Sequence, residues 1–340
     1  MLEIMNIILL SGGSGKRLWP LSDDIRSKQY IKIFKNSDGK YESMLQHIYR
    51  KLKSTNTNSL ITIAASKSQI STIKNQIADN VDISEEPCNK DTFPAIVLAT
   101  AYLHDVKKIP LDETVIVCPV DHYVKEDYFA ELSQLCKLAQ ESSVNLSLIG
   151  INPTYPSEKY GYIIPESLDK VSKVKMFKEK PDSDTARSYI ENGALWNSGI
   201  FAFKLRYVLD IAHKLIDFKD YYDLYEKYET LEKISFDYAV VEKETDTQVM
   251  RFCGQWKDLG TWNTFTESMD KNIIGKVITD ETCNNTHIIN ELNIPILCMG
   301  AKDMVVVATS QGILVTDKQQ SSYMKPFVEK LNIFDDGYEK

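Results

Sequence analysis

Short apolar runs alternate with amphipathic stretches through the first half of the chain, and this alternation constrains the fold more than any other feature of the sequence. The apolar runs, each about as long as a strand, cover residues 5–10, 60–65, 114–119 and 144–149. The stretches with apolar residues at helical spacing cover residues 42–52, 68–78, 94–103 and 128–140. Alternating strands and helices are typical of parallel strands joined by right-handed crossovers. We therefore predict a Rossmann-like α/β fold with a mixed, mainly parallel sheet, whose apolar strands are buried on both faces.

The alternation of apolar runs and amphipathic stretches ends after residue 150. Residues 154–180 predict strands and loops, residues 205–233 predict charged helices, and short β-rich segments return from residue 273. The helical region carries tyrosines that suit either a stacking platform for bases or, as we favour, an aromatic packing edge: Tyr207, Tyr221, Tyr222, Tyr225 and Tyr228. A chain of 340 residues exceeds what one core usually organises. We predict a large domain over 1–270 and a small β-rich domain over 271–340.

Composition and charge exclude several classes of protein. Hydrophobic residues make up 43% and charged residues 26% of the chain, as in ordinary globular proteins. The formal charge of −8 offers no basic surface for nucleic acid, no apolar run is long enough to span a membrane, and the six cysteines include no CxxC pair. Glu3 stands where a signal peptide carries Lys or Arg, so the apolar N-terminus predicts a buried strand. We expect a soluble cytoplasmic protein with no nucleic-acid or membrane partner.

A glycine-rich segment directly follows the first predicted strand, which ends at Leu10. Its glycines and the cations after them are Gly12, Gly13, Gly15, Lys16 and Arg17. Closely spaced glycines let the backbone turn tightly and bring N–H groups against an anion, and a helix starting here would add to that field. Lys28 can supply a further positive charge. The segment is therefore a candidate phosphate-binding loop, with a plain glycine turn as the alternative.

This loop matches neither familiar phosphate-binding motif. A Walker A loop would need Gly at position 10 and Ser or Thr at position 17, where this chain has Leu10 and Arg17. The dinucleotide fingerprint, started at Gly13, would need a glycine at position 18, which is Leu18. The failed fingerprint weakens the interpretation of the chain as a nicotinamide-dependent oxidoreductase.

Asp121 follows the third predicted strand in the sequence Val117-Cys-Pro-Val-Asp-His-Tyr123. Open α/β sheets bind ligands just beyond the carboxyl ends of their strands. A carboxylate at this place can hold a magnesium ion that bridges phosphates. The alternative is a helix N-cap, a position that Asp fills well.

Three later segments carry further candidate ligand-binding groups. Glu179 and Lys180 precede a proline, so we expect extended backbone in which their side chains point in opposite directions. Asn197 stands next to Ser198 and Gly199 beside an apolar strand, and Asp258 lies in a turn between two tryptophans. Each of these residues, taken separately, could equally form a salt bridge, a turn or a core corner.

Taken together, these segments resemble the mannose-1-phosphate guanylyltransferase family of sugar-phosphate nucleotidyltransferases. The matching motifs span nearly the whole chain. They are Gly12-Gly-Ser-Gly-Lys-Arg-Leu-Trp-Pro-Leu-Ser22, Lys28-Gln-Tyr30, Glu86-Pro87, Thr92-Phe-Pro-Ala95, Pro119-Val-Asp-His122, Tyr160-Gly-Tyr-Ile163, Phe177-Lys-Glu-Lys-Pro-Asp182, Trp196-Asn-Ser-Gly199, Ser235-Phe-Asp-Tyr-Ala239, Glu242-Lys243, Trp256-Lys-Asp-Leu-Gly-Thr-Trp262, Asp303-Met-Val-Val-Val307 and Gly312-Ile-Leu-Val-Thr-Asp317. The chain departs from the family pattern at Lys90-Asp91-Thr92, where Arg-Asn-Thr is usual, and at Ser27 and Asp23, where Pro and Arg are usual.

The resemblance implies transfer of a guanylyl group from GTP to mannose 1-phosphate, giving GDP-mannose and pyrophosphate with Mg²⁺ as cofactor. The implied catalytic residues are Arg17, Lys28, Asp121, Lys180 and Asp258, of which Asp121 and Asp258 would carry the metal. The implied nucleotide-binding residues are Leu10, Gly12, Gly13, Gly15, Lys16, Arg17, Lys28, Glu86, Asp91, Thr92 and Asp121. The implied residues for the sugar phosphate are Tyr160, Gly161, Glu179, Lys180, Asn197 and Asp258.

Several alternatives stay open at this point. The same chemistry could serve another sugar 1-phosphate, such as a heptose, or another nucleotide base, because pocket shape rather than motif decides the substrate. A non-catalytic subunit that binds a nucleotide sugar is a further alternative, although the charged positions that catalysis needs are all present. Relatives often dimerise through a small C-terminal β-rich unit, so a homodimer is a hypothesis by analogy.

Overall fold

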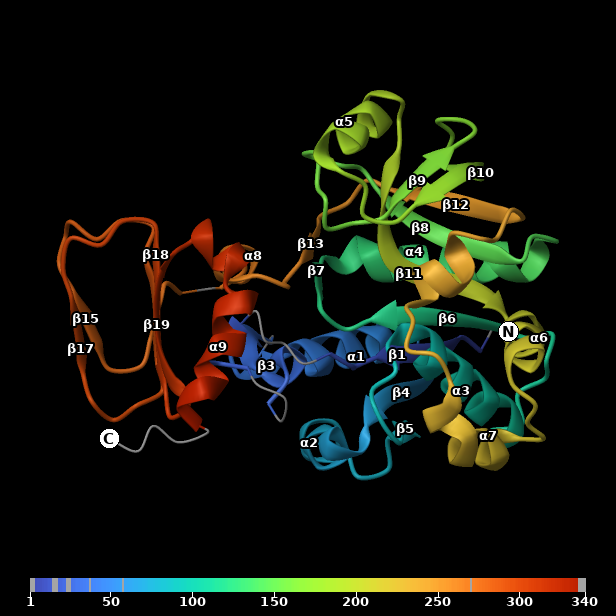
Figure 1. The fold of residues 1–340 in the computed structure, drawn as a ribbon, viewed down its shortest axis with the longest axis horizontal. Helices are drawn as coiled ribbons and strands as arrows, with labels where there is room; N and C mark the ends of the chain where they lie inside the picture. The colour runs from blue at the N-terminus through green and yellow to red at the C-terminus, as the bar shows by residue number, and fades with distance from the viewer. Residues whose placement is uncertain are drawn as a thin grey trace. The chain divides into compact units, whose positions relative to one another are not determined.

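A computed structural model describes residues 4–13, 18–22, 26–36, 38–56, 58–269 and 271–335 of the chain (Figure 1). The chain divides into two compact units. The first unit comprises Met1–Gly12, Ile48–Val120 and Val124–Trp256, and the second comprises Gly13–His47, Asp121–Tyr123 and Lys257–Lys340. The predicted division into 1–270 and 271–340 stays a prediction.

A nine-stranded mixed sheet organises the first unit. In spatial order its strands are β5 (Asp82–Glu86), β4 (Leu60–Ser66), β1 (Asn6–Leu10), β6 (Thr114–Pro119), β11 (Leu195–Lys204), β8 (Leu146–Ile151), β12 (Thr247–Phe252), β10 (Val171–Lys178) and β9 (Tyr162–Pro165). The pairs β5–β4, β4–β1, β1–β6 and β8–β12 are parallel, whereas β11 and β10 run against their neighbours. The mixed, mainly parallel sheet is therefore confirmed. Two strands depart from the parallel direction: β11, which separates β6 from β8, and β10, which separates β12 from β9.

Helices surround this sheet. They are α1 (Met44–Thr55), α2 (Ile70–Gln76), α3 (Thr92–Asp105), α4 (Glu126–Glu141), α5 (Ser183–Glu191), α6 (Leu205–Leu215) and α7 (Tyr221–Lys227), with the 3₁₀ turns η3 (Lys67–Gln69) and η4 (Tyr228–Thr230) and the π-helical turn η5 (Asp237–Val241). On β6, Val117 belongs to the core cluster that includes α3, whereas the Sγ of Cys118 lies 3.7 Å from Tyr128 Oη on α4. Successive strand residues point to opposite faces, so α3 and α4 cover opposite faces of the sheet.

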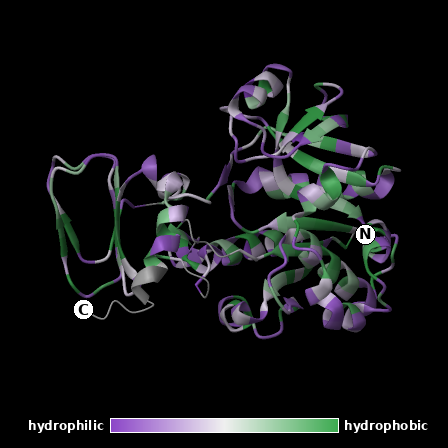
Figure 2. Ribbon diagram, viewed as in Figure 1, coloured by the Kyte–Doolittle hydropathy of each residue, from purple (hydrophilic) through white to green (hydrophobic). Residues whose placement is uncertain are grey.

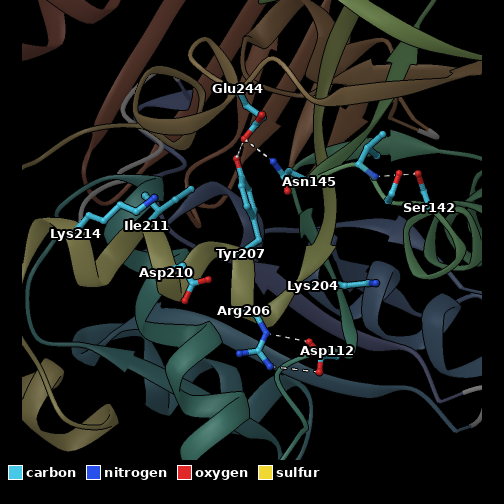
Figure 3. Close-up of a pocket in the computed structure, with 12 residues that line it drawn as sticks. Asp112, Ser142, Asn145, Lys204, Arg206, Tyr207, Asp210, Ile211, Lys214 and Glu244 are labelled. Carbon is cyan, nitrogen blue, oxygen red and sulfur yellow. Dashed lines mark hydrogen bonds and ion pairs between the residues drawn. The ribbon is translucent and has the colours of Figure 1, made fainter.

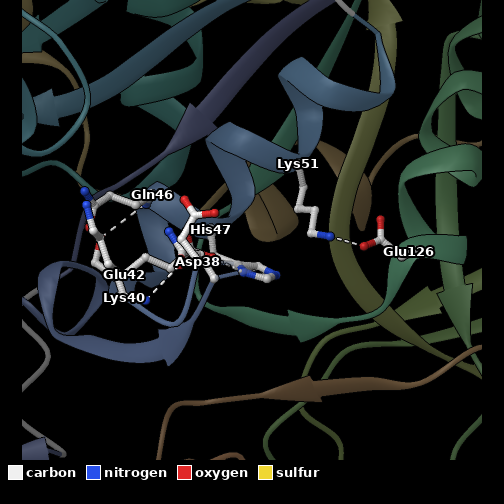
Figure 4. Close-up of polar contacts among 9 residues, drawn as sticks. Asp38, Lys40, Glu42, Gln46, His47, Lys51 and Glu126 are labelled. Atoms are coloured by element: carbon white, nitrogen blue, oxygen red, sulfur yellow. Dashed lines mark hydrogen bonds and ion pairs between the residues drawn. The ribbon is translucent and has the colours of Figure 1, made fainter.

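The first turn of α1 is fixed by local polar contacts (Figure 4). The Ser43 backbone N–H donates to Gln46 Oε1 at 3.1 Å, and the Gln46 N–H donates to Ser43 Oγ at 3.2 Å, which is a reciprocal capping box. His47 Nδ1 lies 2.7 Å from Glu42 Oε1 in the same turn. These contacts explain why the helix begins at Met44 rather than at residue 42, where the apolar spacing places it.

Apolar side chains fill the core of the first unit. Figure 2 shows its central strands in the hydrophobic colours. Tyr221 and Tyr228 are buried in this core, as the packing interpretation of the tyrosines predicts, while Tyr222 stays 66% exposed. The tyrosine-rich segment therefore contributes packing area to the sheet unit.

The second unit is built from short strands. Three two-stranded sheets pair β2 (Lys32–Lys35) with β3 (Tyr41–Ser43), β7 (His122–Val124) with β13 (Trp256–Asp258), and β15 (Val277–Thr279) with β17 (Ile296–Cys298). A four-stranded sheet contains, in spatial order, β14 (Ile273–Ile274), β16 (His287–Asn290), β18 (Met304–Thr309) and β19 (Gly312–Asp317). Its helical segments are η2 (Lys28–Tyr30), α8 (Trp262–Thr266), η6 (Gln320–Tyr323) and α9 (Lys325–Asp335). The parallel pairs β14–β16, β16–β18 and β15–β17 stack successive turns of the C-terminal chain on one another. Leu18, Trp262 and Val305 share one core, so distant segments fold together.

No helix in the described part of the chain is long and apolar enough to cross a lipid bilayer.

Candidate active site

The predicted residues of the first unit gather at one edge of its sheet. Leu10 ends β1 and Glu86 ends β5, and these strands are parallel, so their carboxyl ends share an edge. β11 runs the other way, and its residue Asn197 pairs with Gly150 near the carboxyl end of β8. Open α/β sheets bind ligands at the edge where the parallel strands end. The fold therefore places these residues where a ligand site is expected.

The glycine-rich loop is described only in part. Gly12 and Gly13 follow β1, and Gly13 has a φ of 110°, a backbone conformation that favours glycine. Gly15, Lys16 and Arg17 lie outside the described residues, so their predicted phosphate contacts stay predictions.

In the second unit, Lys28 lies between two carboxylates. Its Nζ is 2.6 Å from Asp121 Oδ2 and 4.0 Å from Asp258 Oδ1. Lys28 begins η2, Asp121 precedes β7, and Asp258 ends β13, the strand that pairs with β7. The side chains of Lys28, Asp121 and Asp258 are only 15%, 31% and 27% exposed. Three predicted site residues from distant parts of the sequence thus form one cluster, named here the lysine–dicarboxylate cluster.

The helix-cap interpretation of Asp121 is wrong, because the residues that follow it form the strand β7 rather than a helix. Burial by itself would raise the pKa of Asp121, but the charge of Lys28, helped by His122, outweighs it and holds that pKa well below the ordinary range. Burial lowers the pKa of His122 in spite of the nearby carboxylates of Asp121 and Asp258. Near neutral pH the cluster therefore contains ionised Asp121 and a neutral imidazole.

Gly260 leaves room for the second carboxylate. A Cβ at position 260 would lie 3.0 Å and 3.1 Å from the two carboxyl oxygens of Asp258. Contacts this short would force the Asp258 side chain to move. The glycine in Trp256-Lys-Asp-Leu-Gly260 therefore helps to keep Asp258 directed at Lys28.

The lysine–dicarboxylate cluster fits a hard divalent cation. Two carboxylates already converge on one positively charged group, and Mg²⁺ prefers oxygen ligands and keeps places for water and phosphate oxygens. Within the described residues, no group of three or more His, Cys, Asp or Glu side chains could hold a metal ion. A metal held by Asp121 and Asp258 would therefore be completed by water and substrate.

A second group of predicted residues meets where β10 ends. The Lys180 ammonium forms an ion pair with the Glu179 carboxylate, and Glu179 is buried. The expectation of extended backbone at Lys180 is wrong, because its φ is 44°, in the left-handed region. The chain turns sharply here between β10 and α5, and this turn brings both side chains together rather than pointing them apart.

Gly161 makes space for Glu179. A Cβ at position 161 would lie 2.5 Å from Glu179 Oε2 and 2.7 Å from Phe177 Cζ. The Gly161 carbonyl also accepts the Asn197 backbone N–H at 2.8 Å. Gly161 therefore joins the predicted residues Glu179 and Asn197 in one place.

Asn197 is held on both sides of its amide. Its Nδ2 donates to Asp237 Oδ1 at 2.6 Å, and its Oδ1 accepts the Gly199 N–H at 3.1 Å. Burial raises the pKa of Asp237 to about 7, the charge of Glu179 adds to the shift, and Lys180 opposes it. Sequence reasoning assigns no role to Asp237, although the residue lies in the motif Ser235-Phe-Asp-Tyr-Ala239. The signal that could have found it is an Asp inside a conspicuous motif.

Glu86, the last residue of β5, belongs to a third group of predicted residues. Its carboxylate is buried, accepts a hydrogen bond from Tyr228 Oη at 2.9 Å, and lies 4.0 Å from where a Cβ of Gly12 would stand. Asp91 caps α3 by accepting the Thr92 N–H at 2.7 Å, and Thr92 Oγ1 accepts the Phe236 N–H at 2.8 Å. Asp91 and Thr92 thus have structural partners, and their contact with a nucleotide stays a prediction.

Tyr160 lies in an aromatic cluster. Its ring centroid is 4.9 Å from that of Trp196 and 5.6 Å from that of Trp256. Aromatic rings at these distances stabilise one another by packing. The predicted contact of Tyr160 with the sugar stays a prediction.

Comparison with known proteins places these groups in a family. The nucleotidyl transferase family model matches residues 6–273. The chain belongs to this family. A mannose-1-phosphate guanylyltransferase of Escherichia coli is 30% identical, covering 96% of this chain and 75% of the relative. Another, of Salmonella montevideo, is 29% identical over 96% of this chain and 74% of its own. The predicted resemblance is confirmed.

Solved structures agree with the family assignment. A Thermus thermophilus protein described as a mannose-1-phosphate geranyltransferase superposes with a TM-score of 0.77 at 26% identity, covering 98% of this chain and 100% of its own. A UDP-glucose pyrophosphorylase complexed with UDP-glucose superposes with a TM-score of 0.54 at 17% identity, over 78% of this chain and 97% of its own. The second likeness shows that the fold is shared.

A pocket of about 410 Å³ in this nucleotidyl transferase is lined by none of the predicted site residues, and Figure 3 shows the residues that do line it. Asp112, Asn145 and Lys204 mark its place, because Asp112 and Asn145 shortly precede β6 and β8 and Lys204 ends β11. The pocket is therefore at the opposite edge of the sheet from the carboxyl ends. Tyr207 Oη donates to Glu244 Oε2 at 2.6 Å there, which ties α6 to the segment before β12.

Proposed function

We propose that this chain transfers the guanylyl group of GTP to mannose 1-phosphate, giving GDP-mannose and pyrophosphate. The observation that carries the proposal is the lysine–dicarboxylate cluster of Lys28, Asp121 and Asp258, which gathers the charges that a phosphate-transfer site needs. The similarity to proteins named mannose-1-phosphate guanylyltransferase supports the choice of base and sugar.

The chemistry needs positioning and charge neutralisation more than it needs a general base. A phosphate oxygen of the sugar phosphate is already an anion, and it attacks the α-phosphorus of GTP. The bond from that phosphorus to the oxygen bridging to the β-phosphate breaks, and this oxygen leaves with pyrophosphate. Bringing two polyanions together is the main obstacle, so fixed positive groups and N–H donors lower the barrier.

Residues of the two units have separate roles in this reaction. The triphosphate is bound by backbone N–H groups of the Gly12–Gly15 loop together with Lys16 and Arg17. Glu86 accepts hydrogen bonds from the base. Lys180 binds the phosphate group of the sugar phosphate. The Glu179 carboxylate accepts hydrogen bonds from the sugar hydroxyls, and the Asn197 amide donates to them. Lys28 is the cation that binds phosphate in the second unit.

Asp121 and Asp258 are the residues that would hold Mg²⁺. When bound, the metal supplies positive charge that offsets the charge developing at the α-phosphate. The low pKa of Asp121 keeps that ligand ionised throughout the physiological range. Lys28 keeps the two carboxylates directed at a common point.

The direct test compares Asp258→Asn with the wild-type protein in a pyrophosphate-release assay containing GTP, mannose 1-phosphate and Mg²⁺. Asn keeps the shape but lacks the charge, so we expect turnover to fall by about 100-fold or more. Glu281→Gln removes an exposed charge in the same unit and serves as the matched control, with turnover unchanged. Equal turnover in Asp258→Asn and the wild type would contradict the proposed role.

A homodimer and a cytoplasmic location belong to the same proposal. The outer strands β15 and β17 expose apolar side chains, with Ile278 66% and Leu297 69% exposed. Exposed apolar groups that lie together are typical of an interaction surface. A second copy of the chain is the proposed occupant, by analogy with relatives. The cytoplasmic location follows from the substrates, because GTP and sugar phosphates are made there.

A further inference from the structure

Tyr228 is a buried tyrosine that the proposed reaction does not use. It lies in η4, and its side chain is completely buried. Its Oη donates to Glu86 Oε2 at 2.9 Å, and Glu86, the last residue of β5, is only 7% exposed. The other carboxyl oxygen, Oε1, faces the glycine-rich loop, 4.0 Å from the Cβ position of Gly12. Tyr228 thus holds one oxygen of a carboxylate whose other oxygen borders the proposed nucleotide site.

A neighbouring pair offers a natural comparison. Tyr225 Oη donates to Glu85 Oε1 at 3.1 Å, one residue earlier on β5 and one turn earlier in the helical segment. Glu85 and Tyr225 are less buried than Glu86 and Tyr228. Two tyrosine–glutamate hydrogen bonds therefore link the same two segments, and only one of them ends on a carboxylate assigned to the nucleotide.

We propose that Tyr228 is a positioning residue that holds Glu86 in the orientation and ionised state that recognise guanine. This inference rests on the proposed function. Guanine presents two donors side by side, N1–H and the 2-amino group, and an ionised carboxylate accepts both. Adenine presents an acceptor at N1, which an ionised carboxylate repels. A carboxylate fixed by Tyr228 therefore favours guanine over adenine.

Protonation of Glu86 would remove this preference. Burial raises the pKa of Glu86 to about 7, the Tyr228 hydrogen bond lowers it, and the charge of Asp91 raises it. The groups around the pair are Tyr228 from η4, Asp91 from the turn before α3, and Cys88 on the segment after β5. Guanine binding is then strong above the pKa of Glu86 and weak below it. Loss of the Tyr228 hydroxyl moves this midpoint to higher pH.

The test measures the Kd of GDP-mannose by calorimetry between pH 5.5 and 9 for the wild type, Tyr228→Phe, Tyr225→Phe and Glu86→Gln. GDP-mannose is the probe because its two phosphates have no group that titrates in this range. In Tyr228→Phe we expect a Kd about tenfold higher near pH 7, since a hydrogen bond to a charged group is lost, and a midpoint displaced to higher pH. Tyr225→Phe should give the wild-type profile, and Glu86→Gln should lose the midpoint.

Three results would overturn the inference. They are a Tyr228→Phe profile that overlays the wild type, equal changes in Tyr228→Phe and Tyr225→Phe, and a wild-type midpoint retained in Glu86→Gln. The last variant decides the matter if Tyr228→Phe does not fold. A parallel pyrophosphate-release assay keeps the two proposals apart, because a wild type that binds GDP-mannose with the expected profile but releases no pyrophosphate contradicts the proposed function alone.

Discussion

Glu86 and Asp237 are carboxyl groups that folding withdraws from water at the proposed site. Burial raises both of their pKa values to about 7, far above those of ordinary carboxyl groups. A group whose pKa is raised in the folded state destabilises that state as soon as it must be ionised. Polar groups retained at such a cost are characteristic of functional sites. Both residues lie among the predicted ligand-binding side chains, which fits a site that accepts hydrogen bonds from substrate.

Replacing Asp237 by Asn should stabilise the protein in a pH-dependent way. The folded-state pKa of about 7 exceeds the ordinary 3.8. The free energy of unfolding of the wild type therefore falls as the pH rises from the ordinary pKa of Asp237 to its folded-state pKa. Asn cannot ionise, so the gain in unfolding free energy should be about 3 kcal/mol larger at pH 8 than at pH 5. Urea unfolding at the two pH values measures this difference. Equal gains at the two pH values would contradict the raised pKa of Asp237 in the folded state.

Short elements of the sheet were largely predictable from the sequence. The apolar runs became β1, β4, β6 and β8, because a strand buried on both faces needs an uninterrupted apolar stretch. The placement of β11 between β6 and β8 was not predictable, since pairing direction depends on partners far away in the sequence. The assembly of the second unit from distant segments was not predictable for the same reason, since Leu18 and Trp262 share a core although most of the chain separates them.

The residues of the site were likewise predictable only where a local sequence motif marks them. Motifs alone single out Lys28, Asp121 and Asp258, and the structure brings them together. Motifs give no role to Asp237 and Tyr228. Asp237 matters because it accepts a hydrogen bond from Asn197, and Tyr228 because it donates one to Glu86; both bonds form only in the folded chain. The sharp turn at Lys180 was also missed, since a residue before proline usually favours extended backbone.

Gly161→Ala tests whether the turn before β9 shapes the sugar site. The new methyl group would lie 2.5 Å from Glu179 Oε2, so this flexible carboxylate has to move while the sheet stays intact. We expect the KM for mannose 1-phosphate to rise about tenfold and the KM for GTP to stay unchanged. Thermal unfolding provides the control, because a large drop in Tm would show damage to the fold. An unchanged KM for the sugar phosphate would remove Glu179 from the sugar site.

At the scale of the whole molecule, the chain passes repeatedly between its two compact units. Gly13–His47 and Asp121–Tyr123 join the C-terminal segment in the second unit, so this unit draws on the start, the middle and the end of the sequence. The lysine–dicarboxylate cluster depends on this interleaving, since Lys28, Asp121 and Asp258 come from those three segments. Folding of the second unit is therefore what assembles the proposed metal ligands.

Leu297→Asp tests the proposed homodimer. A charge placed among the exposed apolar groups of β15 and β17 should abolish association, because burying an unpaired carboxylate is strongly unfavourable. Sedimentation velocity at micromolar concentration should show a dimer for the wild type and a monomer for this variant. Leu168→Asp, at a position 75% exposed in the first unit, is the matched control and should stay dimeric. A monomeric wild type would contradict the homodimer.

The central claim is tested most directly by magnesium-dependent pyrophosphate release with GTP, ATP, CTP and UTP, each paired with mannose 1-phosphate. We expect release with GTP alone, accompanied by formation of GDP-mannose, and no release when Mg²⁺ is chelated. Release with another nucleotide in preference to GTP would contradict the assigned base. Absence of release with all four nucleotides would contradict mannose 1-phosphate as the acceptor.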